Sequence, residues 1–499
     1  MKNLKINIPS LLRFILLLLP ILILSGPLLS DAAVILIATY FIFNPKILSK
    51  DKKIKYLFFF FLSFYMLINI SAFLSNYVTF TLNSIFYFRF ILFAFCFAFI
   101  INNPVFFFKY LSLIISIIFI TLLIDGLSEF FLSKNLLNYD NKYNNRVSSL
   151  FKDELVLGSY TVRLLPILLG SLIYCLNFKR NINYIILVFV YLVGLILILL
   201  SGERTSLILF LSFSLFVFIF WKTKLIFKLF LIMTIPIMMM LFISDSFKNR
   251  FLIEPLIQTN LISQNTFKKL KLIDSSDFEY PDYNKINKRK YFFSIHHHRH
   301  YSSALKIFKT HFIIGAGPKS FAVSCKEEKF RVYFLDEWAG HIDIDEWSKV
   351  NDYGDYQNFD NEYQRFVDNQ FNAENMSIGY IKLMTKDQAC STHPHNTHIQ
   401  ILSELGLLGY AFILSFIVII IYLAIKIKFN QIIFKDSRLK DFSIFILGCC
   451  FMNLWPLSPS GNFFNNWLSI LYYLPVGLLI YCFSQRTIKN EKVSNKFFK

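Results

Sequence analysis

Charged side chains are scarce in this 499-residue chain, in which Asp, Glu, Lys and Arg together make up 17% of the residues. Hydrophobic residues make up 55%, and many charge-free apolar runs are too long for an ordinary soluble domain. These runs also lack the alternation of polar and apolar residues that the strands of a membrane β-barrel require. The two absences favour an all-α polytopic membrane protein.

Acidic residues are outnumbered, because 51 Lys and Arg against 32 Asp and Glu give a net charge of +19. In a soluble protein this balance would indicate binding to nucleic acid. Here the basic residues flank the apolar runs, which the positive-inside rule explains. We therefore expect the basic residues to lie beside a membrane, and we expect no binding to nucleic acid.

The apolar runs predict twelve transmembrane helices. Their expected ranges are 11–25, 28–43, 56–74, 84–101, 105–124, 155–176, 182–200, 205–221, 225–243, 398–425, 441–455 and 464–483. The first run has the length of a signal-peptide core, but no small-residue cleavage site follows it and the second run starts at once. We expect these two runs to form an uncleaved helical hairpin.

Two short loops, 75–83 and 456–463, contain no lysine or arginine, whereas the loops that alternate with them are rich in both. This asymmetry predicts that both termini are cytoplasmic and that the long polar segment lies outside. The expected domains are helices one to nine in 1–243, an outer loop domain in 244–397, helices ten to twelve in 398–484 and a basic cytoplasmic tail in 485–499. In the outer domain we expect helices near 301–310 and 316–330 and an acidic stretch near 336–372.

Cysteines are few, and five of the seven lie within apolar runs. Cys325 and Cys390 differ, because both lie in the long outer segment. If that segment faces an oxidising compartment, the two are a candidate disulfide.

Polar residues crowd the point where the outer segment enters an apolar run, in HPHNTHIQILSELGLLGY at 393–410. This stretch predicts a turn with Asn396 as the cap of the next helix. Thr397, Gln400 and Glu404 then recur at helical spacing and form one polar stripe. A glutamate within a span either serves a functional site or forms a hydrogen bond that holds two helices together.

Metal-binding patterns are weak. The H-P-H triplet at 393–395 lacks the spacing of a helical ligand pair, and HHHRH at 296–300 has no ordered carboxylate or thiolate nearby. A histidine acting as general base is the better interpretation, because imidazole titrates near working pH. GAGPKS at 315–320 also lacks the spacing of a nucleotide-binding loop, and it predicts a glycine turn before a helix with a weak phosphate contact.

Arginines lie near the outer ends of several predicted helices. Arg204, in the turn SGERTS, precedes a helix that Ser201 or Thr205 can cap. An arginine beside a helix N-terminus suits a phosphate, and the alternative is an arginine that snorkels to the interface. The other arginines expected to line one basic outer cavity, suited to a diphosphate without a divalent ion, are Arg89, Arg146, Arg163 and Arg299.

In this order, the motifs resemble the O-antigen ligase and O-antigen polymerase family of bacterial envelope glycosyltransferases. SGERT is similar to the turn S-G-[ST]-R-[TG], with Glu203 in place of the usual serine or threonine. The H-N pair at 395–396, followed after nine residues by Gly406 and then Gly409, is similar to the ligase pattern H-[NSQ]-x9-G-x-x-[GTY]. The segment 301–321 resembles W-x-x-A-L…P-x-x-G-x-G-x-x-F, with tyrosine in place of tryptophan.

The resemblance implies a GT-C-like fold in the bacterial inner membrane, with a periplasmic loop domain. It also implies a metal-independent inverting transfer, without cofactor, from an undecaprenyl-diphosphate-linked glycan. The acceptor is lipid A–core in a ligase and another lipid-linked glycan in a polymerase. By position, Arg204 would bind the donor diphosphate, His395 would activate the acceptor hydroxyl, and Arg299 is the best match for an arginine of the outer loop.

The candidate substrate-binding set further contains Arg89, Arg146, Arg163, Asn396, Glu203 and Glu404. Either glutamate would orient a histidine or hold an arginine. Ligase is favoured over polymerase by the H-N-x9-G pattern. A membrane transporter is the alternative from another class, but neither internal repeats nor broken helices are visible in the sequence.

Overall fold

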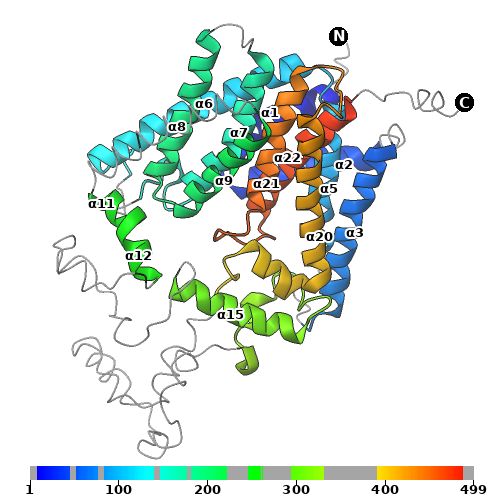
Figure 1. Ribbon diagram of the computed structural model, residues 1–499, viewed down its shortest axis with the longest axis vertical. Coiled ribbons are helices and arrows are strands. Elements are labelled where there is room, and N and C mark those ends of the chain that lie inside the picture. Colours follow the sequence, from blue (N-terminus) through cyan, green and yellow to red (C-terminus); the bar gives the residue numbers. More distant parts are fainter. Residues whose placement is uncertain are drawn as a thin grey trace, which may run out of the picture.

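The computed structural model describes residues 8–44, 52–76, 84–139, 146–176, 181–221, 236, 245–259, 261, 294–330 and 390–486. Within these ranges the chain forms helices and turns, and no β-strand (Figure 1). The expected acidic stretch 336–372 lies outside the described residues.

The principal helices follow the chain in a simple order. They are α1 (Ile8–Leu24), α2 (Pro27–Phe43), α3 (Lys52–Leu74), α5 (Phe88–Ile100), α6 (Pro104–Leu132), α7 (Leu157–Cys175), α8 (Asn181–Leu200), α9 (Arg204–Phe220), α15 (Ile295–Thr310), α20 (Thr397–Lys428), α21 (Arg438–Asn453) and α22 (Asn466–Ser484). Short elements complete them: η3 (Ser149–Phe151), α11 (Asp245–Lys248), η4 (Asn249–Ile253), α12 (Glu254–Gln258), α16 (Phe321–Ser324) and η5 (Glu328–Phe330).

Six of these helices, namely α3, α6, α7, α8, α20 and α22, are long and apolar enough to cross a membrane. Helices α1, α2, α5 and α9 are apolar but shorter. This composition is consistent with a polytopic membrane protein. Eleven of the twelve expected ranges coincide with a described helix, whereas the ninth, 225–243, lies outside the described residues apart from position 236. The total of twelve spans stays a prediction.

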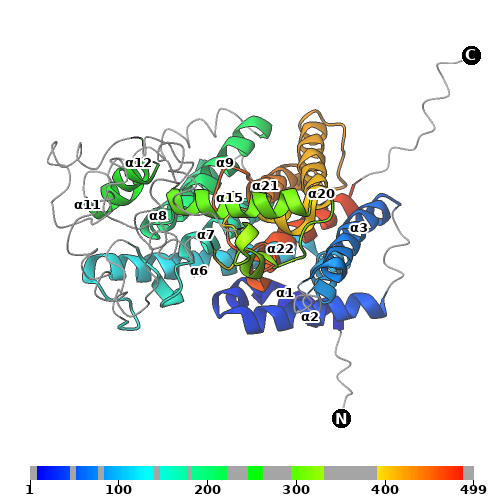
Figure 2. The same ribbon diagram turned by 90° about the horizontal axis from the view of Figure 1, so that it is seen from below.

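The bundle is built around α21 and α22. Helix α22 packs against α5, and α21 packs against α7. Helix α15 lies across one end of the bundle, where it packs against α20, and Figures 1 and 2 show it from the side and from below. We call this end the α15 end. Helix α22 finishes at the opposite end (Figure 1).

Helix α6 is longer than expected, because it continues to Leu132 rather than ending near residue 124. Its last turns carry two buried carboxylates, Asp125 and Glu129. The Asp125 carboxylate accepts hydrogen bonds from the backbone N–H of Leu136 and the hydroxyl of Ser149. Glu129 accepts two bonds from the backbone of residues 148 and 149. The two acidic side chains therefore fold the following loop back onto the helix, which lets the helix extend.

Helix α20 is broken, contrary to the expectation of unbroken helices. Gly406 has φ 66° and ψ −163°, values that only glycine adopts readily. The break frees backbone groups, and the segment 312–317 binds them. The backbone N–H of Leu407 donates to the carbonyl of Phe312 at 2.8 Å, and the backbone N–H of Gly317 donates to the carbonyl of Glu404 at 2.9 Å. We call this paired backbone, 312–317 with 403–408, the clasp.

The outer segment differs from its expected helices. Helix α15 begins at Ile295, six residues earlier than expected, and Ser294 caps it by accepting from the backbone N–H of His297. The helix expected at 316–330 is reduced to α16 and η5. A small apolar core that includes Ile307 and Phe321 packs this part of the chain against Ile399 of α20.

Candidate functional site

The turn before α20 presents His395 at the α15 end. His395 has φ 59°, a left-handed conformation that is unfavourable for a residue with a Cβ atom. Its carbonyl accepts a hydrogen bond from the backbone N–H of Ser460 at 2.9 Å. As expected, Asn396 caps α20, because its side-chain oxygen accepts from the backbone N–H groups of His398 and Ile399. The strained turn is thus held from both sides.

The loop between α21 and α22 supports the same turn. The Asn396 amide donates to the carbonyls of Pro456 and Ser458 at 2.9 and 3.2 Å. The His393 ring contacts the carbonyl of Ser460 at 3.0 Å, and the His398 ring contacts the carbonyl of Leu454 at 2.9 Å. Each of these three side chains thus bonds to a backbone carbonyl of the loop between α21 and α22. His393, Asn396 and His398 therefore serve to position the turn.

Three imidazoles gather around the ring of His395. Its ring centroid lies 4.1 Å from that of His393, 5.3 Å from that of His300 and 5.8 Å from that of His297. The last two belong to α15, so the packing of α15 on α20 assembles the group. Within the described residues, no group of three or more His, Cys, Asp or Glu side chains is arranged to hold a metal ion.

His395 is neutral in this environment. Burial, followed by the neighbouring rings of His393, His300 and His297, lowers the pKa of His395 to about 3. The Ser391 hydroxyl contacts its Nε2 at 2.9 Å. This departs from the expectation of an imidazole that titrates near working pH. The free base is available at neutral pH, but it is a weak base until negative charge is placed beside it.

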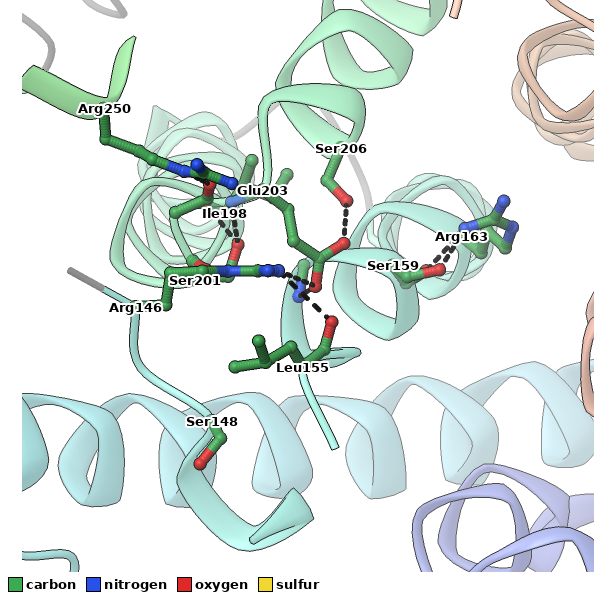
Figure 3. A network of polar contacts seen from close by, with 12 residues as sticks. Arg146, Ser148, Leu155, Ser159, Arg163, Ile198, Ser201, Glu203, Ser206 and Arg250 are labelled. Atoms are coloured by element: carbon green, nitrogen blue, oxygen red, sulfur yellow. Dashed lines mark hydrogen bonds and ion pairs between the residues drawn. The ribbon is translucent and has the colours of Figure 1, made fainter. Parts of the chain in front are cut away.

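A second polar cluster surrounds the turn 201–204 (Figure 3). Arg204 forms an ion pair with Glu254 at 3.8 Å, and its side chain is 28% exposed. Arg250 pairs with the same carboxylate at 2.8 Å and donates to the carbonyl of Gly202 at 3.3 Å. Two guanidinium groups thus share one carboxylate. Figure 1 shows α12, which begins with Glu254, on the same lower side of the bundle as α15.

Glu203 organises the interior of this cluster. Its carboxylate accepts hydrogen bonds from the backbone N–H of Gly158 at 3.0 Å and the hydroxyl of Ser206 at 2.8 Å, and it lies 4.0 Å from Arg146. Burial raises the pKa of Glu203, while Ser206 and Arg146 oppose that rise. Gly158 is needed for this close approach, because a Cβ atom there would lie 2.4 Å from the Ser201 hydroxyl oxygen.

The expected caps of α9 are wrong. Glu203 occupies the cap position, and Thr205 lies within the helix. Ser201 donates instead to the carbonyl of Ile198 and accepts from the backbone N–H of Glu203, which tightens the preceding turn. Glu203 fulfils the expectation that a glutamate holds an arginine, since its partner is Arg146.

Within the described residues, the five candidate arginines do not line one cavity. Arg146 and Arg204 belong to the cluster of the 201–204 turn. Arg163 is buried in α7 and bonds to Ser159, and Figure 3 shows it beyond Ser159 as seen from Glu203. Arg299 is buried in α15. Arg89 forms a bidentate pair with Asp31 between α2 and α5.

Glu404 is completely buried, and its partners belong to the chain itself. Its carboxylate accepts from the backbone N–H groups of Lys319 at 2.9 Å and Phe321 at 3.3 Å, and from the amide of Gln400 at 3.0 Å. The loop GAGPKS, expected to make a weak phosphate contact, therefore binds the carboxylate of Glu404. Glu404 therefore has the structural role that was the alternative to a functional one: it holds the loop at 319–321 against α20, next to the clasp.

The structure joins Cys325 and Cys390 in a disulfide whose Cα atoms are 5.4 Å apart. The bond links the residue after α16 to the segment that leads into His395. The five other cysteines, in or beside helices of the bundle, are free.

Sequence reasoning missed several residues of these sites. Arg250 and Glu254 have the spacing i, i+4 of a helical ion pair, and that spacing was a usable signal. His297 and His300 were visible only as part of a histidine-rich stretch. Lys319 was visible only as part of the stretch GAGPKS, and Asp31 carries no motif.

In comparisons with known proteins, no family model and no curated protein matches the chain.

Proposed function

We propose that this protein is an O-antigen ligase-like glycosyltransferase. It transfers a glycan from an undecaprenyl-diphosphate donor to a sugar hydroxyl of a lipid A–core acceptor. The observation that carries the proposal is the presence of two sites: a half-buried neutral imidazole in the turn before α20, and a guanidinium-rich turn at the start of α9. These are the two groups that inverting transfer needs, namely a base and a stabiliser of the leaving diphosphate.

The arginine cluster suits the leaving group. Arg146, Arg204 and Arg250 outnumber the carboxylates of Glu203 and Glu254. Guanidinium groups bind phosphate oxygens through paired hydrogen bonds, and the N-terminus of α9 adds a favourable dipole. The exposed part of Arg204 is the point at which a diphosphate would bind.

The imidazole suits the acceptor. As the acceptor hydroxyl attacks the anomeric carbon, the bond from that carbon to the diphosphate oxygen breaks, and the proton passes to His395. A diphosphate bound nearby raises the pKa of this imidazole by electrostatic attraction, which makes it a stronger base only when the donor is present.

The broken helix α20 does not favour a transporter. In transporters, backbone groups freed by a helix break line the substrate path. Here the freed groups at Gly406 bind the segment 312–317, so they are occupied by the chain itself.

The proposal places both termini in the cytoplasm and the α15 end on the periplasmic side of the inner membrane. Deletion of the gene, followed by gel analysis of envelope glycans, tests it. A ligase mutant accumulates long glycan on the lipid carrier and leaves the core bare. Single repeats on the core would indicate a polymerase instead, and an unchanged glycan pattern would refute both.

A further inference from the structure

A cavity of about 470 Å³ lies between α2, the start of α5 and the turn before α16. One wall is a single face of α2, formed by Ile35, Ala38, Thr39 and Ile42, which recur at helical spacing. Ile35 and Ile42 are 47% and 52% exposed. In a membrane these side chains meet lipid, so this wall is an apolar groove that is open to the bilayer.

The polar end of the cavity contains Arg89, Asp31 and Lys319. Arg89 donates to Asp31 through Nε at 2.9 Å and Nη2 at 3.3 Å, and through Nη1 to the carbonyl of Phe86 at 2.6 Å. These three bonds fix the plane of the guanidinium. They also leave donors of Nη1 and Nη2 for a further acceptor.

Lys319 reaches the cavity from a constrained position. Its φ is 61°, a left-handed value that costs free energy for lysine, and its backbone N–H is held by the carboxylate of Glu404. Burial lowers the pKa of Lys319. The fold thus keeps the ammonium group of Lys319 at the polar end of an apolar groove. The backbone of Lys319 holds an unfavourable conformation there because Glu404 binds its N–H.

We propose that this cavity binds an anionic bilayer phospholipid, whose headgroup is a phosphodiester with a net charge of −1. Among the side chains that line the cavity, two cations and one carboxylate leave one net positive charge, which matches the single negative charge of such a headgroup. A diphosphate carries at least two negative charges and would leave an excess. The headgroup phosphate lies between Arg89 and Lys319, and an acyl chain follows the face of α2.

Bound lipid also supports the clasp. Lys319 is joined to Glu404 through its backbone, so a phosphate that holds its ammonium group stabilises the loop on which the first segment of α20 rests. This inference does not depend on the reaction proposed above.

Native mass spectrometry of the delipidated full-length protein tests the inference. Phosphatidylglycerol should bind about tenfold more tightly than phosphatidylcholine. Lys319→Asn, which tolerates the left-handed backbone, should remove this preference. Asp31→Asn should keep or increase it, because the cavity becomes more positive. Thr39→Trp fills the groove and should weaken both lipids, whereas Leu36→Trp, on α2 but outside the cavity, should weaken neither.

Three results would overturn the inference. The first is equal binding of both lipids by the unaltered protein. The second is a Lys319→Asn or Thr39→Trp variant that binds as the unaltered protein does. The third is displacement of phosphatidylglycerol by equimolar undecaprenyl diphosphate or by millimolar inorganic phosphate, since the cavity would then be a donor site or a simple anion site.

Discussion

The carboxylate of Glu404 accepts a hydrogen bond from the backbone N–H of Lys319 at 2.9 Å, across 85 residues of sequence. A buried carboxylate is costly unless hydrogen-bond donors surround it, and Phe321 and Gln400 supply two more. This residue therefore explains how the loop GAGPKS is attached to α20.

Replacement of Glu404 by glutamine should destabilise the protein by about 2 kcal/mol, because an amide cannot accept at both of its terminal atoms. Thermal unfolding in detergent measures the change. Glu327→Gln is the control, because this partly exposed carboxylate should contribute less than about 0.5 kcal/mol. Equal stability of the two variants would show that the Glu404 bonds do not hold the clasp.

Gly406→Ala should disrupt the clasp. A Cβ atom at this position would lie 2.5 Å from the carbonyl carbon of Ile313, and the φ of 66° disfavours any L-residue. Gly126→Ala is the matched control, since its nearest neighbour would be a Val147 methyl group at 3.4 Å. We expect a loss of folded protein for the first and none for the second, as measured by size-exclusion chromatography. A well-folded Gly406→Ala variant would contradict this geometry.

The sequence predicted helices better than contacts. Apolar runs located eleven of the expected helices, because a membrane helix is determined by local composition. The same runs could not reveal the break at Gly406, since it depends on the segment 312–317 pairing with α20. Asn396 was predicted as a cap from its neighbours alone. The partner of Glu404 was not, because Lys319 lies 85 residues away and its stretch GAGPKS suggested a phosphate contact rather than a carboxylate.

In the candidate site, too, local features were predicted and contacts were not. Arg204 and His395 were selected from short motifs, whereas the residues around them depend on packing. His300 and His297 meet His395 only because α15 lies across α20. Their rings contribute to the lowered pKa of His395, which no local sequence feature predicts.

Stability should depend on His395 below neutral pH. Its pKa is lowered from 6.5 to about 3 in the folded protein, so between these values the unfolded chain binds more protons. Stability therefore falls as the pH drops through about 6.5. Between pH 7.5 and 5.5 the protein should lose about 1 kcal/mol more than its His395→Asn variant. Parallel unfolding curves for the two proteins would contradict the neutral state of this ring.

The disulfide should be present in the isolated protein. Alkylation under denaturing conditions should label the five free cysteines before reduction and all seven after it. Removal of both partners, as Cys325→Ser with Cys390→Ser, should lower stability by about 2 to 4 kcal/mol, because the bond spans 65 residues. Seven labelled cysteines before reduction would show that the bond is absent.

The most direct measurement is glycan transfer by the purified protein from an undecaprenyl-diphosphate-linked donor to lipid A–core. His395→Asn, which tolerates the left-handed turn, and Arg204→Lys, which keeps the charge, should each lower kcat/KM by about 100-fold or more. The control Arg438→Lys, at the start of α21, should retain most of the activity. Transfer that is unaffected by the first pair, or no transfer by the unaltered protein, would contradict the account.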